Sequence, residues 1–189
     1  MRGAIIETLV TVRRLSGILL LAGFALNFGG VVMYSFGTEY GWVTETPAYH
    51  AWERGLFMAG YVAAALGVAL LEPVLSKAGA TILPRLVATA FPMATVVVLV
   101  MEALSFAGAG APAALVVLAV LLLFGAEVLL GGALLVIRLV PAWIGWATVA
   151  WNVAWPVVLA VVSPGDPYYP VLHAIPLLVI GIPLVRRAG

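Results

Sequence analysis

Six long runs of apolar residues divide this chain of 189 residues, and each run is bounded by charged residues, proline or glycine. A helix of about 20 apolar residues can cross the hydrocarbon core of a bilayer, which is about 30 Å thick. The runs are continuously apolar instead of alternating with a period of two, which favours helices over barrel strands. We therefore expect an all-α integral membrane protein, a compact bundle of six transmembrane helices over residues 15–36, 52–71, 86–106, 113–137, 143–162 and 170–185.

The composition excludes an ordinary soluble domain. Hydrophobic residues make up 65% of the chain and charged residues only 9%, against about 25% charged residues in soluble domains. The net charge is +1 and no basic patch is interleaved with aromatic residues, so we expect no nucleic-acid partner. The absence of cysteine removes disulfides and thiolate metal sites from consideration.

The basic residues predict the orientation of the chain in the membrane. With the N-terminus in the cytoplasm, Arg54 is the one base that falls outside, which agrees with the tendency of Lys and Arg to remain on the cytoplasmic side. The C-terminus is then cytoplasmic as well. We expect a bacterial-type, multi-pass protein of the inner or plasma membrane. The bases assigned to the cytoplasmic side are Arg2, Arg13, Arg14, Lys77, Arg85, Arg138, Arg186 and Arg187.

Connection lengths favour a single domain over residues 1–189. The one long connection covers residues 37–51 on the outer side, and long loops in compact folds often carry function. The other connections are short, so neighbouring helices should pack antiparallel. Close packing of these helices is expected at four glycines, which let backbones approach each other. These are Gly23, Gly30, Gly125 and Gly132.

An internal repeat is a further possibility. Segment 19–30 matches segment 121–132 at a constant offset of 102 residues, through a Leu-Leu-Leu start and a Gly-Gly end. The first and fourth runs cross the membrane in opposite directions, so a true repeat would be an inverted arrangement of three plus three helices. The alternative is that Leu and Gly are simply abundant in membrane helices, and the other two pairs of runs do not align.

Two glutamates lie within the predicted spans. Glu127 falls near the middle of the fourth run and Glu102 near the outer end of the third. A charged side chain in mid-bilayer costs about 2.5–3.5 kcal/mol on insertion scales, so each acid needs a reason to be there. We expect both glutamates to face the bundle interior. Removal from water then favours the uncharged form, so at least one of them should be protonated near neutral pH. Such a group can carry a proton, act as a general acid or balance a cationic ligand. The alternative is a hydrogen bond that only serves packing.

Helical spacing extends these acids into polar stripes. Thr95, Glu102 and Ser105 share one face of the third run, and Thr148, Asn152 and Trp155 share one face of the fifth. A further stripe on the first run contains Asn27. The two asparagines could alternatively be interhelical hydrogen-bond partners. The side chains expected to line a binding path are Asn27, Tyr61, Trp151, Asn152, Trp155 and His173.

The two histidines are predicted on the outer side. His50, Glu53 and His173 could together bind a metal or haem, because neutral imidazole is the commonest metal ligand. The spacing matches no recognised ligand pattern, so the expectation is no cofactor. The alternative explanation is interfacial polarity, with Glu53 paired to Arg54.

Some of these residues resemble parts of a known family. Met101-Glu102, Asn152-Val153-Ala154-Trp155 and the pair His50 and Glu53 are similar to scattered pieces of the emopamil-binding sterol isomerase group. The resemblance covers about a dozen residues with different spacings, and that group has about five spans. In that family intramembrane acids and a tryptophan stabilise a carbocation, which implies acid–base chemistry for Glu102 and Glu53 here.

Three hypotheses of function follow from the sequence. The first is a helical bundle that binds or transports a small amphiphilic or cationic solute. Transport would be coupled to protons through Glu127 and Glu102, and the protein could form a homodimer. The second is an intramembrane enzyme of isomerase or cyclase type, acting on an isoprenoid- or sterol-like substrate with Glu102, Glu127 or Glu53 as the catalytic acid. The third is a structural subunit of a larger membrane complex, with lipids as its other partners.

Overall fold

The computed structural model describes residues 2–76, 82–162 and 174–186, and helices account for most of them. The described residues contain no strand, which confirms the all-α prediction. The helices are α1 (Arg2–Tyr34), α2 (Pro47–Ser76), α3 (Ile82–Phe106), α4 (Ala113–Ile137), α5 (Ala142–Val162) and α6 (Ile175–Arg186), and a π-helical turn η1 (Ser35–Glu39) continues α1.

Four of these helices are long and apolar enough to cross a membrane: α1 from Glu7 into η1 as far as Gly37, and α2, α3 and α4 over their whole lengths. The predicted bounds of the third and fourth spans agree closely with α3 and α4. The first prediction was too short, because α1 begins at Arg2 and includes the charged residues before the apolar run. The sixth predicted span, 170–185, corresponds to a described helix of only 12 residues, and its residues 170–173 lie outside the described part of the chain.

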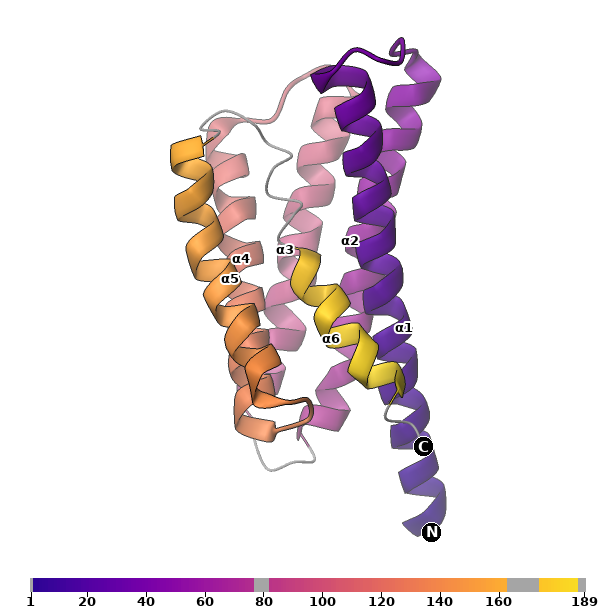
Figure 1. Cartoon of the computed structure of the whole chain (residues 1–189), viewed down its shortest axis with the longest axis vertical. Coiled ribbons are helices and arrows are strands. Elements are labelled where there is room, and N and C mark those ends of the chain that lie inside the picture. The colour runs from indigo at the N-terminus through magenta and orange to yellow at the C-terminus, as the bar shows by residue number, and fades with distance from the viewer. Residues whose placement is uncertain (1, 77–81, 163–173, 187–189) are drawn as a thin grey trace.

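Consecutive helices pack side by side, and α6 returns to α1 (Figure 1). α1 packs on α2, α2 on α3, α3 on α4 and α4 on α5, while α6 lies against α1 and touches α5. α1 begins and α6 ends at the same end of the bundle, and the 37–46 connection lies at the other end (Figure 1). We call these the terminal end and the loop end.

Apolar side chains fill the interior at both depths of the bundle. Near the terminal end, one cluster joins all six α-helices through buried residues such as Leu20, Val68, Leu130 and Ile180. Nearer the loop end, a smaller cluster contains Phe57 and residues of α3 and α4. The polar side chains described below therefore lie among apolar neighbours, where an unmet hydrogen bond is costly.

Glycines set the closest helix crossings. A Cβ added at Gly131 of α4 would lie 3.0 Å from the Gly145 carbonyl oxygen of α5, and a Cβ at Gly145 would lie 3.0 Å from that of Gly131. Gly23 meets α2 in the same way, and Gly30 lies against the Phe57 ring. The prediction was wrong for Gly125 and Gly132, because nothing lies within 4 Å of a Cβ at either position. Apolar periodicity alone did not show which face of α4 meets α5.

Substituting Gly131 by alanine is expected to destabilise the protein, whereas the same change at the adjacent Gly132 is expected to be neutral or stabilising. At Gly131 the new methyl group meets a backbone oxygen, and overpacking of this kind costs about 1–3 kcal/mol. At Gly132 it meets open space, and replacing glycine within a helix gains about 0.5–1 kcal/mol. Thermal unfolding in detergent measures both variants, and equal melting temperatures would contradict the described α4–α5 packing.

Candidate functional site

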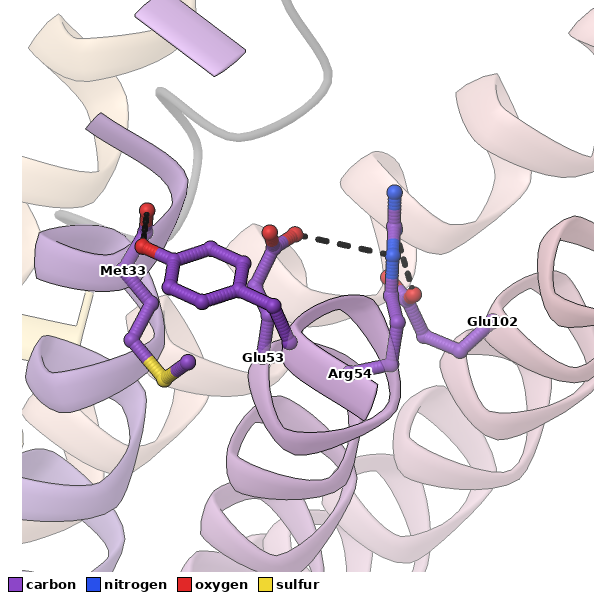
Figure 2. A network of polar contacts seen from close by, with 5 residues as sticks. Met33, Glu53, Arg54 and Glu102 are labelled. Carbon is purple, nitrogen blue, oxygen red and sulfur yellow. Dashed lines mark hydrogen bonds and ion pairs between the residues drawn. The ribbon is translucent and has the colours of Figure 1, made fainter. Parts of the chain in front are cut away.

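An arginine lies between two glutamates near the loop end of the bundle (Figure 2). Arg54 of α2 donates a hydrogen bond from Nη1 to Oε2 of Glu102 on α3, at 2.7 Å. The side chains are 13% and 6% exposed, so the pair is largely removed from solvent. A charge-assisted hydrogen bond of this kind is stronger than one between two neutral groups. It also joins α2 to α3 across their packed interface.

Glu53 is the second carboxylate beside Arg54. Its Oε1 lies 3.6 Å from Arg54 Nε, and its side chain is 1% exposed. Neither oxygen has a hydrogen-bond partner among the described residues. The predicted pairing of Glu53 with Arg54 is therefore present, but as a longer ion pair than that of Glu102. Arg54 faces two buried carboxylates with a single positive charge (Figure 2).

The third buried acid is Glu127, and Tyr61 interacts electrostatically with both Glu127 and Glu102. Glu127 on α4 is fully buried and Tyr61 on α2 is 6% exposed. The Tyr61 hydroxyl lies within electrostatic range of both Glu102 and Glu127. Glu53 and Glu102 in turn interact electrostatically, as do Glu53 and the exposed Glu45. A series of carboxylates thus runs from the exposed loop end toward the middle of the bundle.

Helix register places further polar side chains at the depth of Tyr61. Tyr61 lies seven residues after Arg54, and Thr95 lies seven residues before Glu102 on the antiparallel α3, so both are about 10 Å deeper than the ion pair. A Cβ at Gly60 would lie 2.6 Å from Nδ2 of Asn27, which brings α1 to the same depth. Polar groups of three helices therefore share this layer.

The fourth and fifth helices add to the same layer. A Cβ at Gly131 would lie 3.2 Å from Cβ of Thr148, and Glu127 and Asn152 each lie one turn farther toward the loop end on the antiparallel α4 and α5. Asn152 is 2% exposed. Together with the electrostatic contact between Tyr61 and Glu127, this register gives each of five helices one buried polar side chain at mid-bundle depth.

The two asparagines each donate a hydrogen bond within their own helix. Asn27 donates to the Gly23 carbonyl oxygen at 2.9 Å, and Asn152 donates to that of Thr148 at 2.9 Å. Both of these hydrogen bonds stay within one helix and do not join two helices. Each Oδ1 is buried and has no hydrogen-bond partner among the described residues, and the same holds for Oγ1 of Thr95. The layer therefore contains acceptor oxygens with unused capacity.

The remaining predicted residues are two tryptophans of α5 and the two histidines, of which His173 lies outside the described residues. Trp151 and Trp155 stack on each other along α5, with ring centroids 5.3 Å apart and planes inclined by 7°. His50 is half-buried in the first turns of α2, three residues before Glu53. His173 lies outside the described residues, so the suggested triad of His50, Glu53 and His173 stays a prediction. Within the described ranges no three acidic or histidine side chains form a metal-binding group.

At the loop end, η1 and the loop that follows it pack against the start of α2. Gly37 packs against Tyr49 and Glu45, where an added Cβ would lie 2.9 Å from Tyr49 Cε1 and 3.0 Å from Glu45 Oε1. The Tyr49 hydroxyl donates to the Met33 carbonyl oxygen at 2.5 Å, which ties the start of α2 to the end of α1. π-helical turns are often found at functional sites. Here the turn packs against Glu45, which interacts electrostatically with Glu53.

The fold and the site together define a class of protein: an all-helical bundle that has four candidate transmembrane helices and holds three buried carboxyl groups in its interior. Comparisons with protein-family models, with curated proteins and with solved structures each found no match. The resemblance of scattered residues to the emopamil-binding group thus gains no support from these comparisons.

Sequence reasoning missed the role of Arg54 as the partner of Glu102. The signal was present, because Arg54 is the one base assigned to the outer side and Glu102 lies near the outer end of its helix. Counting turns from each end of the antiparallel pair would have placed the two side chains at the same depth. It also missed Thr95 as a buried, unsatisfied group.

Proposed function

We propose that this chain is a six-span integral membrane protein that binds or transports a small cationic, amphiphilic solute in exchange for protons. The spans, the cytoplasmic termini and the location in a bacterial-type cell membrane are those inferred from the sequence. The acids Glu53, Glu102 and Glu127 form the site, and Tyr61 interacts electrostatically with the latter two.

One observation supports this proposal above all: buried carboxyl groups outnumber the buried base. Glu53, Glu102 and Glu127 are each at most 5% exposed, and Arg54 is the one base that contacts any of them among the described residues. Three ionised carboxylates and one guanidinium would give a net charge of −2 inside an apolar bundle. Such a charge is too costly to remain uncompensated. Protons or a cationic ligand must therefore balance it, and the two compete for the same oxygens.

Competition with protons fixes the sign of the pH dependence. We expect binding of tetraphenylphosphonium, a lipophilic cation, to strengthen from about pH 6 to about pH 8, by up to about tenfold per pH unit when one proton is displaced. Tetraphenylborate has the same shape and the opposite charge, so its binding should show no such increase. Equilibrium binding to the purified protein measures both probes. Binding of the cation that is independent of pH, or equal to that of the anion, would contradict the proposal.

The enzyme hypothesis receives less support. Its carbocation chemistry requires Trp155 and Glu102 at one substrate, but Trp155 is on α5 and Glu102 on α3, and each of these helices packs against α4. Glu102 Oε2 also accepts a hydrogen bond from Arg54 at 2.7 Å, so this oxygen already has a guanidinium partner instead of a substrate.

A further inference from the structure

A second cluster of charge lies at the terminal end of the bundle, far from the carboxylates. Arg13 of α1 has two guanidinium nitrogens, Nε and Nη2, that are buried and have no hydrogen-bond partner among the described residues. A guanidinium group has five donors in a rigid fork, and leaving them unmet after removal from water is costly. Among the described residues, these two Arg13 nitrogens therefore have no negatively charged hydrogen-bond acceptor.

The crossing of α1 and α6 brings a second arginine to this end. A Cβ at Gly17, one turn after Arg13 on the same face, would lie 2.8 Å from Leu184 Cβ and 2.9 Å from Val185 Cγ2. Arg186 follows in the last turn of α6. The two helices run antiparallel (Figure 1), so Arg13, one turn before Gly17, and Arg186, next to Val185, lie toward the same end of their interface. Neither takes part in an ion pair within the described part of the chain.

The depth of this pair matches that of lipid phosphates. Arg13 lies two residues before the apolar run that starts at residue 15, so in the span predicted from the sequence it would lie where the helix meets the headgroup layer. Arginine forks bind phosphate oxygens in a bidentate manner, and basic pockets between helices at a membrane surface are known to bind anionic headgroups. We propose that Arg13, with Arg186, binds the phosphate of an anionic lipid headgroup at the α1–α6 crossing.

The neighbouring Arg14 provides a matched control, because it carries the same charge on the next residue but is exposed. The experiment places wild type, Arg13→Gln, Arg13→Lys and Arg14→Gln in nanodiscs of phosphatidylcholine containing a minor fraction of phosphatidylglycerol. Native mass spectrometry then counts the phosphatidylglycerol molecules retained after release. We expect Arg13→Gln to reduce retention at least about fivefold, Arg13→Lys to reduce it less because one charge but no fork remains, and Arg14→Gln to leave it near wild type.

Thermal unfolding in delipidated detergent separates a lipid site from a structural role. The buried guanidinium nitrogens donate to no described residue, so Arg13→Gln should not lower the melting temperature without lipid, but it should remove the stabilisation that added phosphatidylglycerol confers on wild type. Equal loss of retention in Arg13→Gln and Arg14→Gln would reduce the effect to general surface charge and overturn the proposal. It would also be overturned if inorganic phosphate alone stabilised the protein as strongly as the lipid.

Discussion

Replacing Arg54 by methionine is expected to be among the most destabilising single substitutions in the protein. The change leaves Glu53 and Glu102 buried without their counter-charge, and breaking a buried ion pair from one side costs about 3–5 kcal/mol. A large drop in the melting temperature, or loss of folded protein on size-exclusion chromatography, is the expected result.

The double variant Arg54→Met with Glu102→Gln distinguishes an ion-pair effect from loss of packing. Neutralising Glu102 removes one of the two uncompensated charges, so we expect the double variant to recover part of the stability that Arg54→Met loses. Arg14→Met repeats the change at an exposed position and should have little effect. If Arg54→Met were as stable as wild type, or if the second substitution gave no recovery, Arg54 would not hold the network together.

The second large effect is expected at Glu127. Substitution by glutamine keeps the size of the side chain but removes its ability to exchange a proton for a cation. We expect Glu127→Gln to weaken tetraphenylphosphonium binding at about pH 8 by at least about tenfold, which corresponds to about 1.4 kcal/mol, and to flatten its pH dependence. Equilibrium binding across this pH range provides the measurement.

A matched control for Glu127→Gln is available on α2. Glu72 is half-buried near the terminal end of the bundle, where its Oε1 accepts a hydrogen bond from Ser76 at 2.7 Å. Glu72→Gln removes one carboxylate from the same bundle but far from the proposed site, so its binding curve should match that of wild type. A Glu127→Gln variant that binds with the full wild-type pH dependence would remove Glu127 from the site.

The sequence was sufficient to predict the helical segments and the burial of Glu102 and Glu127. Continuous apolar runs predicted the helical segments, and the cost of an intramembrane charge identified Glu102 and Glu127, both of which are buried. The ends of α1 and α6 were predicted less well. Hydropathy marks the apolar run, whereas α1 continues as a helix into charged residues whose backbone hydrogen bonds do not depend on lipid.

Partner choice could not be read from hydropathy. Glu102 has a charged partner, and the asparagines bond to their own helices, because these outcomes depend on the rotation of each helix about its axis. The error at Gly125 and Gly132 has the same origin. Gly131, one residue away, faces α5 instead, and a rotation of about 100° per residue separates a packed glycine from a lipid-facing one.

Infrared spectroscopy of the carboxyl groups tests the central claim most directly, because a protonated carboxylic acid and an ionised carboxylate absorb at different frequencies. The difference spectrum between wild type and Glu127→Gln at neutral pH should show a protonated carboxyl band from a buried group. Adding tetraphenylphosphonium should diminish that band as protons are released. A fully ionised set of glutamates in the ligand-free protein, with no protonated band and no proton release on addition of the cation, would contradict the account.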